Sequence, residues 1–328
     1  MKHFKGSIII TIIGLLLALY LGGVSALYIV ALLAILEVSL SFDNAVVNAK
    51  VLENMEEKWQ ERFITFGIPI AVFGMRFLFP IIIVAIASGI GIIDTFNLAQ
   101  SDPLGYKEVL ESVEKLIFAF GGAFLLMVFL SFIFDTEREE QWISLIENSK
   151  ILNKMGKITG IQILLATVIG LSLMFLTKGY NISLAYFSGV FLYSLISSLD
   201  KVLSVNGVRN GIVGFLYLEL LDASFSFDGV IGAFALSSDI FIIMLGLGIG
   251  AVFVRSLTLL MLKEKTLAEY RYLEHGAHYA IFALSIIMLL KIFIPINEIV
   301  VGTVGVIFIA VATYHSIVEN KKVKVLVD

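Results

Sequence analysis

The sequence predicts an all-α polytopic membrane protein, with about ten transmembrane helices in two inverted five-helix repeats. Apolar residues make up 59% of the 328 residues and charged residues only 15%, and the mean hydropathy is +0.98. A soluble domain carries about 25% charged residues, so this composition excludes an ordinary soluble fold. Many apolar runs approach or exceed the roughly 20 residues that a helix needs to cross a bilayer. An acidic motif inside a long apolar segment of the first half also returns in the second half.

The long apolar runs predict helical spans rather than strands, because none of them alternates with a period of two. The first run is short, and Gly22-Gly23 must form a tight turn before the second, so nine spans is the alternative count. A cleavable signal peptide is the alternative for residues 1–20, but no small-residue cleavage site follows, and we expect a retained helix. The predicted spans are 7–21, 24–48, 63–88, 115–134, 158–177, 183–203, 212–236, 240–262, 277–294 and 298–315.

The distribution of basic residues decides between nine and ten spans, because cytoplasmic loops are rich in Lys and Arg. With ten spans, one set of loops holds only Lys107 and Lys178. Adding or removing a span would destroy this asymmetry, so we predict ten spans with both termini in the cytoplasm. The opposite set of loops holds Lys2, Lys5, Lys50, Lys58, Arg62, Arg138, Lys150, Lys154, Lys157, Arg209, Lys263, Lys265, Arg271, Lys321, Lys322 and Lys324.

Two connections between spans are long enough to form structure of their own. Residues 89–114 are predicted outside, as a loop with a short surface helix. Residues 135–157 are predicted inside, as an amphipathic connector whose charges at 137–140 form a solvated face. His275 and His278 have helical spacing that suits a metal, but they lie at the predicted cytoplasmic boundary, and we expect an interfacial role.

A repeat extends beyond the acidic motif. Residues 70–76, which end in an arginine, resemble residues 249–255, which also end in one. An odd number of helices per repeat makes the second copy enter the membrane from the opposite side, which is a common plan for alternating-access transporters. The predicted divisions are 1–157 with the first acidic motif and the connector, 158–177 as the span that completes the first repeat, and 178–328 as the second repeat.

The acidic motif occupies residues 37–44 and returns at 219–229. Ser41-Phe42-Asp43 is identical to Ser226-Phe227-Asp228, and each Asp follows an acidic residue by six positions, Glu37 or Asp222. A carboxylate inside the membrane is costly and marks a functional site by default. A single copy could instead be a polar contact between helices, but two matched copies favour an ion site between the two halves.

Helix geometry restricts how the motif can bind one ion. Six residues along an α-helix turn the side chain about 120° away, so Glu37 and Asp43 do not share a face. An interruption near Ser-Phe-Asp would relieve this and free backbone carbonyls for a cation, and Gly229 permits one. The alternative is an unbroken helix whose acidic groups serve two different contacts, and of the two we favour interruption at both motifs.

The candidate ligands all offer oxygen atoms, which suit Mg²⁺, Ca²⁺ or Mn²⁺ rather than Cu⁺ or structural zinc. The chain has no cysteine, so thiolate metal sites are excluded. Up to five carboxylates exceed the charge of one divalent ion, which leaves room for proton coupling. Arg76 and Arg255 are the expected counter-charges, although Arg255 near a span end could also snorkel to the interface. Further candidate ligands are Ser41, Glu219 and Ser226.

These residues resemble the TerC family of integral membrane proteins, in its DUF475-type branch, over roughly residues 24–290. The resemblance rests on the two acidic motifs and the two arginine segments. It implies a role in manganese export. After the second Asp the chain has Gly229-Val230-Ile231 where many TerC proteins have Ser-Ile-Pro, so the ligands there need not be the family's. The metal-binding positions implied by the resemblance are Glu37, Asp43, Asn44, Asp222 and Asp228.

The predicted function is export of a divalent cation, with Mn²⁺ first, through a carboxylate-lined site at the middle of a cell inner membrane. The metal is the substrate, and we expect no organic cofactor, no nucleic-acid partner and no enzymatic activity. One alternative is a membrane scaffold or stress-resistance component without transport. The other is an intramembrane di-aspartate enzyme, which the symmetry disfavours because acid–base catalysis needs carboxylates in different environments.

Overall fold

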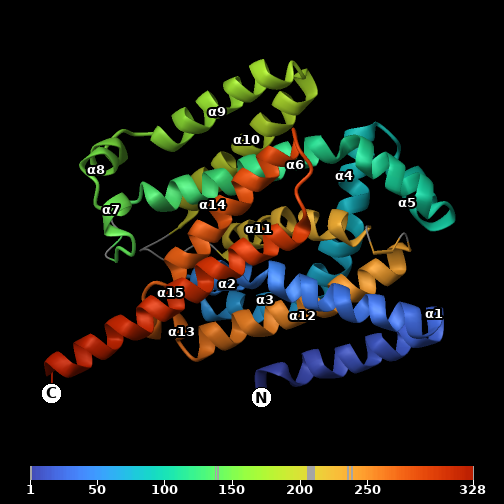
Figure 1. Ribbon diagram of the computed structural model, residues 1–328, viewed down its shortest axis with the longest axis horizontal. Helices are drawn as coiled ribbons and strands as arrows, with labels where there is room; N and C mark the ends of the chain where they lie inside the picture. The colour runs from blue at the N-terminus through green and yellow to red at the C-terminus, as the bar shows by residue number, and fades with distance from the viewer. Residues whose placement is uncertain are drawn as a thin grey trace.

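The computed structural model describes residues 2–136, 138, 140–204, 211–234, 236, 237 and 239–327, which form helices joined by mostly short connections (Figure 1). These residues include no strand. The helices are η1 (Lys2–Phe4), α1 (Lys5–Leu40), α2 (Phe42–Glu53), α3 (Glu57–Pro69), η2 (Ile70–Leu78), α4 (Phe79–Ser88), α5 (Ile92–Ser101), α6 (Pro103–Ile133), α7 (Ser144–Glu147), α8 (Lys150–Gly156), α9 (Ile161–Thr177), α10 (Tyr180–Leu203), α11 (Gly211–Ala233), α12 (Ile240–Lys263), α13 (Thr266–Glu269), α14 (Leu273–Lys291) and α15 (Glu298–Val327).

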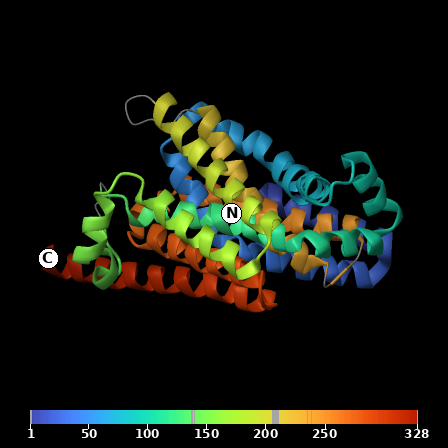
Figure 2. The ribbon, with the colours of Figure 1, turned by 90° about the horizontal axis from the view of Figure 1, so that it is seen from above.

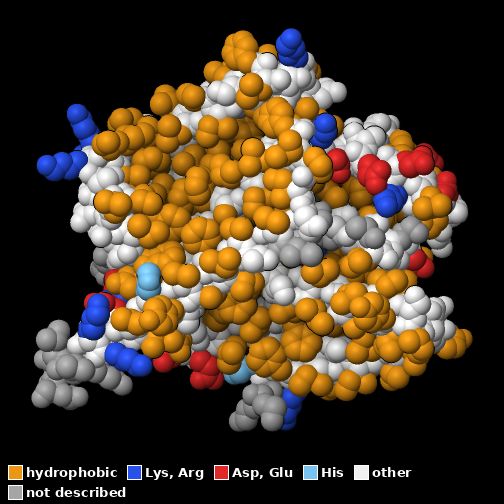
Figure 3. All heavy atoms as spheres, viewed as in Figure 1, with side chains coloured by type: hydrophobic (Ala, Val, Ile, Leu, Met, Phe, Trp, Pro, Cys, Tyr) orange, Lys and Arg blue, Asp and Glu red, His pale blue; other side chains and the backbone are white. Residues whose placement is uncertain are grey.

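The predicted fold class is confirmed: this is an all-α polytopic membrane protein. Seven helical segments in the described part are long and apolar enough to span a bilayer, or eight if α8 and α9, bent by 102°, form one span. Figure 3 shows an outer face covered mainly by apolar side chains, with most charged side chains near its margins. Each of the ten predicted spans falls on helix, but α1 contains the first two and α9 has only 17 residues. The ten-span count and the inverted repeats stay predictions.

α1 is two helices joined at a sharp turn. Gly22 and Gly23 leave the helical conformation, and Gly23 has φ +66°, a value that glycine adopts without steric cost. The two arms lie side by side (Figure 1), and apolar residues of both, including Ala18 and Val30, pack in one cluster with α12. The tight turn expected at these glycines is therefore present.

The middle of the bundle is formed by α6, whose membrane segment is largely buried between α10 and α14. α12 packs closely along α1, because Gly246 and Gly250 leave room for Leu33 and Glu37. A Cβ atom on either glycine would overlap those side chains. Small residues four apart are a common means of close helix packing in membranes. The end of α15 projects beyond the other helices in both views (Figures 1 and 2).

The connections differ in part from expectation. The loop predicted to lie outside does contain a short helix, α5. The next helix begins at Pro103 rather than at 115, because Asp102 caps it by accepting from Gly105 N at 3.0 Å. In the inner connector, the predicted solvated face is wrong at Arg138, which pairs with buried Glu147 at 3.2 Å. Residues 137 and 139 lie outside the described part.

Candidate cation site

The first acidic motif lies where one helix ends and the next begins. α1 ends at Leu40, Ser41 has the non-helical angles φ −108° and ψ 16°, and α2 begins at Phe42. The interruption predicted at this motif is therefore present. α11 runs without a break through the second motif, so the interruption predicted there is wrong. Gly229 permits a break but does not impose one, and an unbroken helix keeps its backbone groups bonded inside the membrane.

Glu37 is held in an enclosed ion pair within the first half of the chain. Arg76 Nη2 donates to Glu37 Oε1, and Ser41 Oγ donates to the same oxygen at 2.8 Å. Arg76 is carried by η2, a π-helical segment, and such segments are rare and frequently found at functional sites. Gly250 of α12 packs against the Cβ and Cγ atoms of Glu37. Glu37 is thus a fixed acceptor with a guanidinium as its counter-charge.

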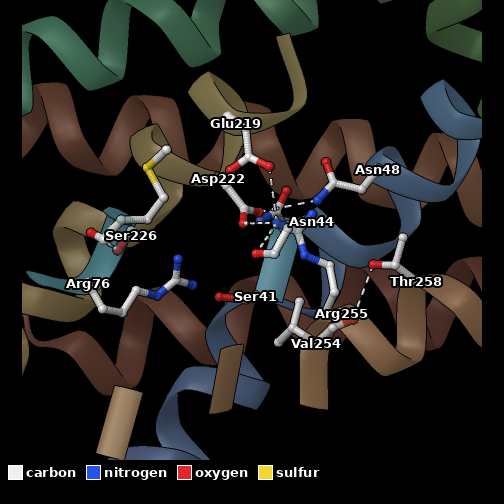
Figure 4. Close-up of polar contacts among 12 residues, drawn as sticks. Ser41, Asn44, Asn48, Arg76, Glu219, Asp222, Ser226, Val254, Arg255 and Thr258 are labelled. Atoms are coloured by element: carbon white, nitrogen blue, oxygen red, sulfur yellow. Dashed lines mark hydrogen bonds and ion pairs between the residues drawn. The ribbon is translucent and has the colours of Figure 1, made fainter. Parts of the chain in front are cut away.

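Asp222 links the two halves of the chain. The Nδ2 atoms of Asn44 and Asn48 both donate to Asp222 Oδ1, the second at 3.2 Å (Figure 4). The two asparagines lie one helical turn apart on α2, so their amides point to one spot. Side chains of the first motif helix therefore hold a carboxylate of the second.

Arg255 completes the contact between the halves. Its Nη2 donates to Glu219 Oε1 at 3.2 Å and to the Gly67 carbonyl at 3.0 Å, and it lies 3.7 Å from Asp222 Oδ2. Its guanidinium carbon also stands 3.6 Å from the centre of the Phe63 ring, a cation–π contact. Snorkelling does not describe this side chain, because it is buried and turned toward the protein interior. Arg76 points toward the same cluster, and the charges of Asp222 and Glu219 act on it (Figure 4).

Asp43 and the second Ser-Phe-Asp stand apart from this network. Asp43 is buried, and its carboxylate accepts from the backbone N–H of Asn44 in the first turn of α2. It forms no ion pair and no hydrogen bond with another side chain that the structure describes. Ser226 Oγ donates to the Met75 carbonyl at 3.4 Å rather than toward a carboxylate of the cluster. The side chain of Asp228 lies outside the described part of the chain.

Burial and charge make the cluster unusual. Three carboxylates of the network stand against two guanidiniums, which leaves one negative charge in excess when all five groups are ionised, and the separate Asp43 carboxylate is a further acidic group nearby. Within the described residues, no three His, Asp or Glu side chains are grouped closely enough to hold one metal ion. The residues of the network and the neighbouring Asp43 are each exposed by 5% or less, and they are Glu37, Asp43, Asn44, Asn48, Arg76, Glu219, Asp222 and Arg255.

Several buried polar atoms of the cluster have no hydrogen-bond partner among the described residues. Three are oxygens, on Asn44, Asn48 and Glu219, and three are guanidinium nitrogens, on Arg76 and Arg255. A buried polar atom without a partner costs about 1–3 kcal/mol, and more when it is charged. So many in one cluster indicate a place that accommodates a polar or charged ligand.

The sequence matches a known family model over most of its length. A family model described as "Protein of unknown function (DUF475)" matches residues 42–323. The chain belongs to the DUF475 family. The matched region begins at the first residue of α2, so it includes Asp43 and Asn44, whereas Glu37 precedes it. No curated protein and no solved structure matches this DUF475 chain.

Asn48 is the cluster residue that was missing from the predicted ligands. It follows Asn44 by four positions, so the sequence places both on one helix face. That spacing could have added Asn48 to the site. The partner could not have been found in this way, because Asp222 lies 174 residues further along the chain.

A second buried polar cluster joins the connector before α9 of this DUF475 protein to α14. Glu147 accepts from Arg138 at 3.2 Å and from Tyr279 at 3.1 Å, and lies 3.4 Å from His275. Burial acts to raise the pKa of Glu147, but hydrogen bonding and charge from His275 and the charge of Arg138 outweigh it and lower the pKa to about 2. His275 and His278 are both buried inside the protein, and their place at the membrane interface stays a prediction.

Proposed function

We propose that this DUF475 protein exports a divalent cation, with Mn²⁺ as the first candidate, across a bacterial-type inner membrane. The observation that carries the proposal is the buried cluster around Asp222, which combines excess negative charge with unpartnered oxygens from both halves of the chain. Transport sites commonly lie at the junction of two halves inside the membrane. Export, manganese and kinship with TerC proteins rest on the resemblance of the acidic motifs.

The two arginines are internal competitors of the cation. Glu37 is paired with Arg76, and Glu219 and Asp222 with Arg255, so a cation binds these carboxylates only as the guanidiniums move away. The competition lets the site release its ion as well as bind it. A carboxylate that always has a positive partner also avoids the cost of an isolated charge in the membrane.

The oxygen atoms of the cluster favour a hard divalent cation. Carboxylate and amide oxygens are the ligands that Mg²⁺, Ca²⁺ and Mn²⁺ prefer, and the chain offers no thiolate. The rival di-aspartate enzyme would need two carboxylates that share a proton. Glu37, Glu219 and Asp222 instead each lie beside a guanidinium, and no two of them are held together as such a pair, an arrangement that suits binding better than proton transfer.

Mn²⁺ uptake into liposomes that contain the purified protein tests the proposal. The unmodified protein should transport Mn²⁺, and Asp43→Asn and Asp222→Asn should each abolish transport while insertion and elution behaviour stay normal. Asp94→Asn is the matched control, because Asp94 of α5 is exposed and outside the cluster. Normal transport by the correctly inserted Asp43 and Asp222 variants would refute the proposal.

A further inference from the structure

The connector between α6 and α9 lies against the end of a membrane helix. α6 is long and apolar enough to span a bilayer, and it ends at Ile133. A Cβ atom on Gly156, the last residue of α8, would lie 3.4 Å from the Phe134 carbonyl and 3.3 Å from the Thr136 side chain. Figures 1 and 2 both show α7 and α8 at the same end of the molecule as the C-terminal end of α15. α8 therefore lies at the level where α6 ends.

The direction of α8 also suits the surface of a bilayer. α8 is bent by 102° from α9, which is one of the predicted spans. A helix at nearly a right angle to a membrane-crossing helix runs close to the membrane plane. Interfacial helices lie in this way, with apolar side chains in the boundary between headgroups and acyl chains and with lysines on the polar face.

The side chains of α8 point in three directions. Leu152 and Met155 are partly buried and pack against the core of the bundle. Lys150 and Lys154 are exposed, and their spacing of four residues places them on one face. Ile151 is 74% exposed, and at 100° per residue it lies between the lysines and the core-facing pair. The outer surface of α8 thus combines an apolar strip with a basic one.

The fold leaves residues 141–160 with a basic outer surface. This segment contains three lysines, all exposed, and a single acidic residue, Glu147. The Glu147 side chain is buried and accepts from Arg138 at 3.2 Å and from Tyr279 at 3.1 Å, so its charge is turned inward and already paired. Leu145, two residues earlier, is 88% exposed. The segment therefore presents positive charge and apolar side chains together, without negative charge of its own to balance them.

We propose that residues 145–158 form an interfacial anchor that binds anionic phospholipids at the membrane surface predicted to face the cytoplasm. Lys150, Lys154 and Lys157 contact the lipid phosphates, and Leu145 and Ile151 enter the boundary below the headgroups. A soluble phosphate would engage the lysines but would leave the two apolar side chains in water, so the surface fits a lipid better. The inference goes beyond the proposed transport and does not depend on it.

Fluorescence quenching at single cysteines tests the position of α8, because the chain has no cysteine of its own. Ile151→Cys and Asn153→Cys each carry a bimane label, in vesicles of phosphatidylcholine and phosphatidylglycerol. Two residues along a helix turn by 200°, so the two labels point in nearly opposite directions. A lipid with a nitroxide high on its acyl chain should quench the label at 151 at least about twofold more than the label at 153. Acrylamide in the water should show the reverse order, and equal quenching at both positions would overturn the proposal.

The same label at 151 measures the preference for anionic lipid. Nitroxide-labelled phosphatidylglycerol should associate with the label more strongly than nitroxide-labelled phosphatidylcholine, by about fivefold for each lysine at the surface. Lys150→Gln with Lys154→Gln should remove most of this preference, whereas the two Lys→Arg changes should keep it. Lys58→Gln with Lys263→Gln is the matched control, because both lysines are exposed and lie on other helices.

Size-exclusion elution checks that each variant is folded. Equal association of the two lipids with the chain that keeps all its lysines would overturn the proposal, and so would an unchanged preference in the double Gln variant of α8. Neither measurement involves transport, so either failure would leave the proposed function standing.

Discussion

Replacing Arg76 by Gln should show separately how the buried ion pair affects the stability of the protein and how it affects the binding of a cation. Arg76 and Glu37 form an ion pair in which each side chain is 1% exposed. Removing one partner of such a pair destabilises a protein by about 3–5 kcal/mol, because the remaining charge is left without compensation. A divalent cation can take the place of the guanidinium, and at a hundredfold excess over its Kd it returns about 2.7 kcal/mol. Mn²⁺ should therefore recover most of the stability that Arg76→Gln loses.

Affinity should change in the opposite direction from stability. Two unit charges 4 Å apart interact by about 4 kcal/mol at an effective dielectric constant of 20, so losing the repulsion of Arg76 should tighten Mn²⁺ binding by at least about tenfold. Transport should fall, since no internal cation then displaces the bound ion.

Thermal unfolding with and without Mn²⁺, together with calorimetric titration, measures both effects of Arg76→Gln. Arg271→Gln is the matched control, because Arg271 is partly exposed and lies 3.9 Å from Glu140, a contact worth about 1 kcal/mol or less. Equal affinity and equal Mn²⁺ stabilisation in the Arg76 variant and the unmodified protein would show that Arg76 does not compete with the cation.

Two further predictions concern the connector and the close helix packing. The folded pKa of Glu147, about 2, lies below the ordinary 4.5, so its contribution to stability is full above pH 4.5 and is lost as the pH falls toward 2. Between pH 4.5 and pH 2, the thermal stability of the unmodified protein should fall more than that of Glu147→Gln. Equal dependence of thermal stability on pH in the two proteins would contradict this role of Glu147. Gly250→Val should displace Glu37, cost about 1–3 kcal/mol from overpacking and weaken Mn²⁺ binding. Gly6→Val is its control, because a Cβ there meets nothing within 4 Å, and an equal loss in both variants would rule out the packing argument.

The sequence predicted the helices well because apolar length alone decides them in a membrane. Each predicted span falls on helix, and the turn at Gly22 and Gly23 follows from two adjacent glycines between apolar runs. The π-helical form of η2 was not predictable, since its residues read as an ordinary apolar run that contains one arginine. Contacts between distant residues could not be predicted either, as the ion pair between partly buried Arg138 and buried Glu147 illustrates.

Helical spacing was informative at the first motif and misleading at the second. Six-residue spacing requires either a break or two different partners, and the sequence cannot choose between them. At the first motif the chain breaks at Ser41, and Glu37 and Asp43 still meet different surroundings. At the second motif the helix is continuous, and Asp222 finds Arg255 and the two asparagines of α2. The choice depends on contacts between residues more than a hundred positions apart.

The charged cluster is better explained by function than by stability. Well-packed apolar side chains of similar volume are often as stabilising as a buried ion pair, or more so, and an apolar replacement would leave no unpartnered atoms. This chain instead keeps two buried guanidinium–carboxylate pairings, and a buried Asp43 that pairs with no guanidinium among the described residues, within helices that are otherwise apolar. The excess of carboxylates over guanidiniums disfavours a purely structural network, because a structural network is most stable when its charges balance. A cluster that still lacks positive charge after both arginines have paired is suited to a mobile divalent cation.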